Sequence, residues 1–473
     1  MKKLGDRPKR IRFILILIII SLLAIALMPY FFGIKAEEAY YRLVNEWSEA
    51  GGIKLISTNY KRGWLKSRSE TVYSLSREGE HKFDIKENDT VIHGPFSFGG
   101  ILGGEFYFKP FLALVDSRVM IKPVSPNDFG DILKLIPPLE IASTISLDGS
   151  GTSNLSLPPF TYKHEKDNEA LEWEGLKGNI EFSRDFHRIR ADLQNPGIKT
   201  VDGSGLFSIN QIVLNLNMDT ENEQINRGSE LNLTVKEIEF RGEDSEGDRA
   251  SGVAISDLVF KGSSKLSEKT IDGSLVVELK SLKSNLAKYG PGNLKIYLRN
   301  IDRVALAEIR KSLNNDSDQN ELNFMLKHLT DIVARSPEIE IKELSLLTPE
   351  GDIIGNAFLR IKGGNSEALN PFAILSALNA EARISVPSKF LVNTLEIIER
   401  QKLKEEFMKT GQQGVTEQVL DEMARNAAKK ETEDLLNQNV FVLKDNKYEL
   451  VATFKDGQLI LNGQALPLSL FPN

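Results

Sequence analysis

Few side chains in this sequence have the type and spacing that catalysis or metal binding requires. The five histidines form no HxH or HxxxH pair and so offer no metal-binding spacing: His81, His93, His164, His187 and His328. His93, in Ile92-His93-Gly94-Pro95, would need a nucleophile and an orienting acid to act as a base, and the sequence nominates neither. We therefore interpret His93 as a turn residue whose imidazole bonds to the backbone.

A second candidate is Tyr60-x-Arg62-Gly63-Trp64, which follows an expected strand. Trp and Arg are suited to recognition, but a glycine bend followed by Trp is also typical of a strand whose Trp fills the core. We favour the second interpretation, with Trp64 buried. The candidate site residues, whose expected role is structural, are therefore Tyr60, Arg62, Gly63, Trp64, His93, Gly94 and Pro95.

Two glycine-rich segments match catalytic motifs only in part. Gly99-Gly100-x-x-Gly103-Gly104 lacks the Lys-Ser/Thr of a phosphate loop and continues as an aromatic strand. Gly203-Ser204-Gly205 lacks the spacing of a nucleophile elbow. The chain has no cysteine, which excludes thiol nucleophiles, zinc-thiolate sites and disulfides. The sequence thus nominates no catalytic, cofactor-binding or metal-binding residue, and we expect no cofactor.

The elements that position these residues begin with an apolar helix. Residues 13–34 carry no charged side chain, and about 20 apolar residues span a bilayer core. Six basic residues in the stub 1–12 place it in the cytoplasm: Lys2, Lys3, Arg7, Lys9, Arg10 and Arg12. Because bulky residues follow Ala24-x-Ala26, we expect an uncleaved anchor, with Tyr30 at the outer interface.

Apolar and polar residues alternate over much of the chain after this helix. The alternation is clear at 212–218, 231–235 and 448–454 and predicts antiparallel strands with one buried face. It slips between Val235 and Ile238 and between Ile341 and Leu344, which predicts a β-bulge or bend. The expected fold class is α+β, predominantly antiparallel β, built on a large curved or bulged sheet or sandwich.

Helical patterns occur at the start of the exported part and again in its C-terminal half. We expect helices at 35–48, continuing the apolar helix, and at 304–313, 321–334, 391–409 and 415–436. Lys455-Asp456-Gly457 predicts a hairpin between 447–454 and 458–462. The expected domains are β-rich 35–300 and α+β 301–473, the latter with the helix pair 391–436 and the terminal hairpin 447–462. Because that hairpin returns to the sheet, we expect the pair to cap the apolar face.

At several motifs the chain resembles the YdgA-like family of uncharacterised bacterial envelope proteins. These motifs occur in order along nearly the whole chain: Tyr60-x-Arg62-Gly63-Trp64, Ile92-His93-Gly94-Pro95, Leu298-x-Asn300-Ile301-Asp302, Thr348-Pro349-Glu350-Gly351, Val386-Pro387 and Asp456-Gly457-x-Leu459. The resemblance implies a single-pass anchor in a Gram-negative inner membrane and a periplasmic body. It implies no activity and no catalytic residues.

These observations favour a non-enzymatic protein, held in the inner membrane by residues 13–34, whose large β-surface serves binding or envelope scaffolding. Handling or transport of a lipid or other hydrophobic ligand is the alternative, and a periplasmic hydrolase is less favoured. The first two differ in whether the apolar face stays open or is filled by the helices. The net charge of −7 argues against a nucleic-acid partner. The ligand, protein partner and oligomeric state are left open.

Overall fold

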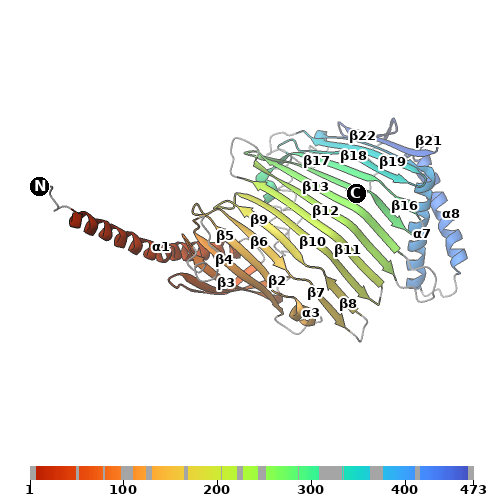
Figure 1. Ribbon diagram of the computed structural model, residues 1–473. Helices are drawn as coiled ribbons and strands as arrows, with labels where there is room; N and C mark the ends of the chain where they lie inside the picture. The colour runs from red at the N-terminus through yellow and green to blue at the C-terminus, as the bar shows by residue number, and fades with distance from the viewer. Residues whose placement is uncertain are drawn as a thin grey trace. The chain divides into compact units, whose positions relative to one another are not determined.

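A computed structural model describes most of the chain, and Figure 1 gives its elements. The chain separates into two compact units: unit 1 contains residues 1–203 and 210–221, and unit 2 contains residues 204–209 and 222–473. The described residues are 7–49, 53–77, 80–96, 110–123, 130–164, 169–203, 205–220, 227–242, 252–285, 287–307, 333, 335–362, 376–410 and 416–466.

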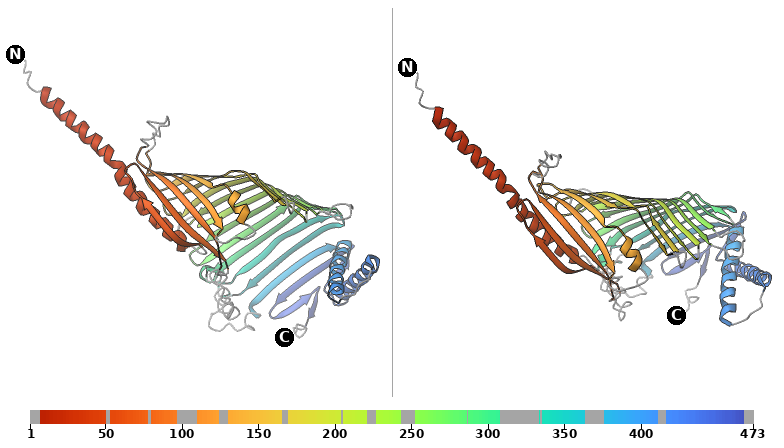
Figure 2. Two further views of the ribbon diagram at one scale, coloured as in Figure 1. Left: turned by 90° about the horizontal axis from the view of Figure 1, so that it is seen from below. Right: turned by 60° about the horizontal axis from the view of Figure 1, so that its bottom comes forward.

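Helix α1 (Arg7–Glu49) opens unit 1 and is 43 residues long. It is long and apolar enough to cross a membrane. The expected helix at 35–48 is its direct continuation, which confirms that the apolar helix extends beyond residue 34. Its N-terminal half projects beyond the sheet, whereas its C-terminal half lies against strands of unit 1 (Figure 2).

The rest of unit 1 is an open antiparallel sheet. Its strands pair in the order β1-β2-β3-β4-β5-β6-β9-β10, and β10 also pairs with β8, which pairs with β7. The elements are β1 (Ile53–Lys61), β2 (Lys66–Arg77), β3 (Glu80–His93), β4 (Ala113–Pro123), α3 (Gly130–Leu135), β5 (Leu139–Ile145), β6 (Gly151–Leu157), β7 (Phe160–His164), β8 (Glu169–Trp173), β9 (Leu176–Phe182) and β10 (Arg188–Asp202).

The core of unit 1 forms where α1 covers one face of this sheet, which we call the helix face. Ala36 of α1 packs with Tyr60, Val91 and Ala113, all buried, and Tyr40 joins the cluster. Strand side chains alternate between faces, so the residues paired with these on neighbouring strands also point toward α1. Burial of this apolar surface is what holds the C-terminal half of α1 to the sheet.

Unit 2 is a second open antiparallel sheet, in the order β12-β13-β14-β17-β18-β19-β20-β22-β23-β24. β15 pairs with β13 and β16, and β21 pairs with β22. The strands are β12 (Arg227–Gly242), β13 (Gly252–Leu266), β14 (Thr270–Leu279), β15 (Ser281–Ser284), β16 (Lys288–Tyr289), β17 (Gly292–Asp302), β18 (Glu338–Thr348), β19 (Gly351–Ile361), β20 (Leu378–Pro387), β21 (Val442–Lys444), β22 (Lys447–Lys455), β23 (Gln458–Leu461) and β24 (Gln464–Leu466). β11 (Gly205–Asp219) is divided between the units.

Both predicted irregularities are present. In β18 the pairing with β19 shifts between Ile341 and Leu344, which is the expected bulge. In β12 the ladder omits the Lys236–Asp257 pair without changing register, and Asp257 has a φ of +50°. The alternation therefore slips there at a bend in the backbone. It is not a bulge, because neither strand has an extra residue between the flanking pairs.

The predicted C-terminal helix pair and hairpin are confirmed. α7 (Ser388–Thr410) and α8 (Glu417–Asn437) lie side by side (Figure 1), and Arg400 of α7 donates to Asp421 of α8 at 2.6 Å. β22 and β23 pair through the two-residue turn Asp456-Gly457, whose positive φ angles are those of a type I′ turn. The helix pair ends at α8, and the chain then returns to the sheet as expected.

The prediction that the helix pair caps the apolar face is wrong. Among the sheet strands of unit 2, α7 makes its main contacts with β20 and β22. Leu275 and Leu298, in the middle of the apolar face, each remain 40% exposed. The two helices contact each other and bury Ala424 and Ala428 of α8, whereas Ile398, Val419 and Met423 of the expected stripes stay exposed.

Other expectations lie partly outside the described residues. The helix expected at 304–313 is described only over 303–307, and that at 321–334 only at Val333. The glycine-rich segment 99–104 also lies outside them. The domain boundary at residue 300 stays a prediction, and β17 (Gly292–Asp302) runs across it within unit 2.

Candidate functional site

The structure brings all seven candidate residues to the place where α1 meets the first strands of unit 1. Tyr60 is the second-last residue of β1, and residues 62–64 lie in the connection to β2. His93 ends β3 and is followed by Gly94 and Pro95. The His93 backbone N–H donates to the Leu65 carbonyl at 2.9 Å, which links the two loops. We call these two loops, with residues 26–40 of α1, the junction.

His93 is the most enclosed polar residue of the junction, at 1% exposed. Its Nδ1 lies 3.1 Å from the Trp64 carbonyl and its Nε2 lies 2.8 Å from Ser67 Oγ. A carbonyl only accepts, so Nδ1 carries the proton and, in the neutral ring, Nε2 accepts from the Ser67 hydroxyl. Burial lowers the pKa of His93, which favours this neutral form. The expected bond from His93 to the backbone is thus confirmed.

The Ser67–His93 pair has the elements of a nucleophile and its base, but its surroundings do not support that role. Ser67 is also 1% exposed, so no substrate can reach its hydroxyl in this arrangement. The second ring nitrogen is held by a backbone carbonyl rather than by a carboxylate. The geometry instead fixes the two loops against each other through three hydrogen bonds.

Two glycines allow the close packing at the junction. A Cβ at Gly33 of α1 would overlap the imidazole of His93, so the helix backbone lies directly on that ring. A Cβ at Gly94 would overlap the Phe111 carbonyl, which the loop after β3 approaches closely. Pro29, one turn before Gly33, is also buried. A larger residue at Gly33 must therefore displace the His93 ring, and one at Gly94 must displace the backbone at Phe111.

The interpretation of Trp64 as a buried core residue is wrong. Its side chain is 50% exposed, and its indole N–H donates to the Ala26 carbonyl of α1 at 3.1 Å. The ring lies 5.6 Å from that of Tyr30. The loop after β1 therefore reaches back along α1 to residues within the apolar run. Tyr60, by contrast, is buried in the unit 1 core and its ring lies 5.0 Å from Tyr40.

Arg62 connects the same loop to the polar end of α1. Its guanidinium forms an ion pair with Glu37 at 2.6 Å and lies 5.4 Å from the centre of the Tyr30 ring. Arg62 and Glu37 are both partly exposed, so the pair contributes little stability by itself. The ion pair does show where the charges lie, because Glu37 follows the end of the apolar run at Ile34.

A buried acidic pair lies on the helix face a few residues from His93. Glu87 and Asp89 of β3 point to the same face as Val91, and the Ser69 hydroxyl donates to Asp89 at 2.6 Å. Burial and then the charge of Asp89 raise the pKa of Glu87 to about 7. Burial also raises the pKa of Asp89, against the effect of its hydroxyl donors. The pair therefore holds a proton at neutral pH more readily than a surface carboxylate does.

This proton makes stability depend on pH. Folded Glu87 keeps its proton up to about pH 7, whereas the unfolded chain releases it near 4.5, so the free energy of unfolding is expected to fall as pH rises between these values. In the parent chain, the free energy of unfolding should fall by on the order of 2 kcal/mol from about pH 5 to pH 8 because of Glu87. Replacing Glu87 with Gln should remove this fall. Chemical denaturation in detergent at both pH values measures it. Glu70→Gln, on the opposite face of β2, is the control, and an unchanged pH dependence in E87Q would contradict the assignment.

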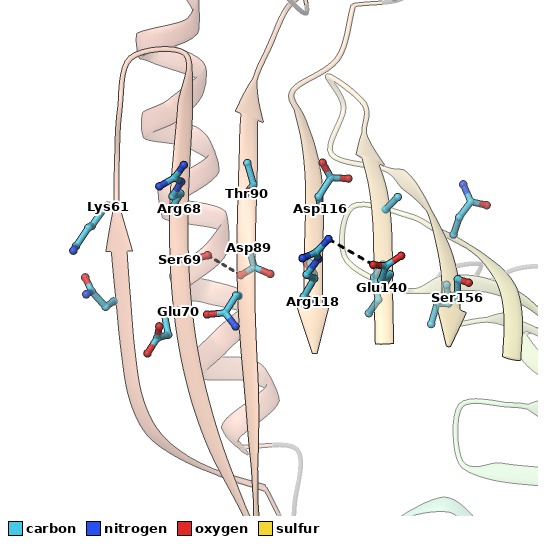
Figure 3. A pocket seen from close by; sticks show the side chains of 17 residues that line it. Lys61, Arg68, Ser69, Glu70, Asp89, Thr90, Asp116, Arg118, Glu140 and Ser156 are labelled. Carbon is cyan, nitrogen blue, oxygen red and sulfur yellow. Dashed lines mark hydrogen bonds and ion pairs between the residues drawn. The ribbon is translucent and has the colours of Figure 1, made fainter. Parts of the chain in front are cut away.

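The opposite face of unit 1 is polar and hollowed. A hollow of about 850 Å³ is lined by side chains of β1–β6 that include Arg68, Glu70, Asp116, Arg118 and Glu140 (Figure 3). Arg118 and Glu140 pair across neighbouring strands at 3.7 Å. Acidic and basic groups are interspersed and no aromatic ring lines the hollow, so it shows no preference for one class of ligand.

The most extensive candidate surface is one face of the unit 2 sheet. Two rows of paired residues cross it from strand to strand. One row is Leu233, Phe260, Val277, Leu294, Leu344, Gly355, Ile384 and Leu450, and the other is Leu231, Gly262, Leu275, Ile296, Ile341, Ala357, Ala382, Ala452 and Leu461. A third, shorter row contains Leu298, Ile339 and Leu359. We call these three rows the apolar face.

The apolar face is not covered as a core would be. Leu231, Leu275, Leu298 and Ile339 are between 40% and 42% exposed. The reverse side of the same strands carries the charged pairs, such as Lys295 with Glu343 at 2.7 Å, with single exposed apolar residues such as Ile354 and Val451 between them. The sheet thus separates water-facing charges from a broad apolar surface, and large exposed apolar patches mark binding surfaces.

Metal binding has no support in the described ranges, where no three His, Asp or Glu side chains come together as a metal site would require. The five histidines are scattered in the sequence, and His93 uses both ring nitrogens within the protein. Whether the chain needs a metal or a nucleotide stays a prediction from sequence.

Comparison with known proteins places the chain among uncharacterised bacterial proteins. The family described as "Bacterial protein of unknown function (DUF945)" matches residues 8–469. Protein YdgA of Escherichia coli (strain K12) is 25% identical over 457 residues, which is 87% of this chain and 84% of that protein. No solved structure matches. The resemblance drawn from the sequence motifs is therefore confirmed.

Proposed function

The chain belongs to the DUF945 family of bacterial proteins of unknown function, and we propose that it is a membrane-anchored envelope protein whose apolar face binds the acyl chains of lipids. The observation that carries this proposal is the uncovered apolar face of unit 2. Its exposed leucines and isoleucine lie in continuous rows, bounded on the other side of the sheet by paired charges.

The dimensions of the face suit an acyl chain. Ten strands spaced about 4.8 Å apart extend the sheet of unit 2 over about 43 Å. One leaflet of a bilayer core is about 15 Å thick, so an extended chain is shorter than the rows. Burying apolar surface contributes about 25 cal/mol per Å², which gives a bound chain a substantial favourable free energy.

Scaffolding by protein contact is the competing function for the same surface. It requires a protein partner with a complementary apolar face, whereas the lipid proposal needs only the membrane in which α1 would be anchored. Scaffolding was preferred on the expectation that the helix pair fills the apolar face. The pair leaves that face uncovered, so this reason for preferring scaffolding no longer applies. The two functions are separated by photo-crosslinking to lipid from position 275 on the apolar face, compared with position 274 on the polar face.

The proposal includes a topology. Six basic residues precede the apolar run, so α1 would cross the inner membrane with its N-terminus in the cytoplasm and both units in the periplasm. A reporter that is active only outside the cytoplasm, fused to the C-terminus, is expected to be active. An inactive reporter on an intact chain would show the opposite orientation or no crossing.

A further inference from the structure

The junction carries exposed apolar side chains beside the apolar run of α1. We infer that the loop Arg62–Leu65, together with Phe96, inserts into the outer boundary of the bilayer beside α1, where Trp64 contacts lipid. This inference rests on the proposed membrane crossing of α1 and adds a second membrane contact, made by the sheet itself.

The position of Trp64 along α1 is the first argument. The uncharged run ends at Ile34, and Trp64 contacts Ala26 and Tyr30. With a rise of about 1.5 Å per residue, these contacts lie about 6–12 Å inside the end of the run. An anchor that spans the bilayer with residues 13–34 therefore brings Trp64 below the headgroups of the outer leaflet.

The second argument is the separation of polar and apolar groups along the junction. Trp64 is 50% exposed and Leu65 48%, and Phe96 on the adjoining loop is 38% exposed. The Arg62 guanidinium lies over the Tyr30 ring and reaches from there to Glu37, which lies beyond the apolar run. Tryptophan is favoured at the membrane interface, where its ring meets lipid and its N–H finds an acceptor, here the Ala26 carbonyl.

The third argument is that the loop is built rigidly. The Trp64 and Leu65 carbonyls accept from His93 Nδ1 and the His93 backbone N–H. His93 is in turn buried against Gly33 of α1. The exposed side chains are therefore held at a fixed depth relative to the helix, and the helix face of unit 1 begins at the level of the acyl chains.

Tryptophan fluorescence tests the inference directly, because the chain has only three tryptophans. Trp47→Phe and Trp173→Phe in the full-length chain leave Trp64 as the reporter. In phospholipid vesicles with bromine on the upper acyl chain, Trp64 emission is expected to fall about twofold, since the ring would lie at the interface. The matched control keeps Trp173, on β8, and replaces the other two; its emission should not respond to the bromine.

A second readout does not depend on tryptophan. Because the chain lacks cysteine, Leu65→Cys accepts a single nitroxide label, which should be more accessible to oxygen than to a water-soluble nickel chelate. The control label at Glu70→Cys should show the reverse. If both reporters are in water while the chain resists alkaline extraction from vesicles, the anchor holds and the loop insertion is overturned. If the chain is extracted, the membrane crossing fails, and the insertion fails with it.

Discussion

A photoreactive benzoylphenylalanine at position 275 is expected to cross-link to lipid at least about tenfold more than one at position 274. Leu275 lies on the apolar face and is 40% exposed, whereas Ser274 points to the polar face and bonds to Ser263 at 2.6 Å. Covering one leucine-sized side chain contributes about 1.5–3 kcal/mol, and 1.4 kcal/mol is a factor of ten in occupancy. Irradiation of cells followed by mass spectrometry of the adducts gives the ratio.

The matched variants make this result specific. Replacing Ile296 and Ile341 with Gln on the same face should lower cross-linking from position 275, because a chain lying along the row of Leu275 crosses both residues. Replacing Tyr297 and Glu340, one residue away on the polar side, should leave it unchanged. Equal lipid labelling from both faces, or adducts with protein alone from position 275, would refute lipid binding and favour scaffolding.

Replacing Gly33 with Leu is expected to detach α1 from the sheet of unit 1. The new side chain would occupy the space of the His93 ring, which hydrogen bonds hold at both nitrogens. Overpacking costs about 1–3 kcal/mol, which corresponds to an increase in opening of about fivefold to a hundredfold. Ser67→Cys in the cysteine-free chain reports that opening as the rate of maleimide labelling in detergent.

The control for this variant lies on the same helix. Phe31→Leu changes a side chain that is 61% exposed, and the Ser67→Cys label should stay as protected as in the parent. Circular dichroism separates local detachment from unfolding, since the strands of both units should persist in G33L. Unchanged protection in G33L would mean that the helix does not hold the junction closed.

The sequence alone determined the elements with strong local signals. The apolar helix was predictable because a run without charges over residues 13–34 has few alternatives. The hairpin at Asp456-Gly457 was predictable because those residues tolerate positive φ, and the irregularity at Ile341 because a change of phase within a strand requires a bulge or a bend. The helices at 388–410 and 417–437 followed from their apolar stripes.

The sequence also indicated which residues gather at the junction, but not how they are used. Trp64 was expected in the core, because a large aromatic after a glycine bend is most often buried. Trp64 instead lies on the surface beside α1, where it contacts Ala26 and Tyr30, which are distant from it in sequence. Glu87 and Asp89 share the strand phase of Val91, which signals two acids on an inward face, yet the proton they hold depends on burial by α1.

Only the tertiary structure decided whether the apolar face is a core or a surface. Alternation along a strand shows that one side is apolar, and this was read correctly at 231–235 and 448–454. It cannot show which element packs on that side, because a helix that could cover the sheet can also pack against another helix. Here α8 buries Ala424 and Ala428 against α7. The helices pack on each other and α7 contacts the sheet only near β20 and β22, which is the physical reason that the middle of the sheet keeps an exposed apolar face.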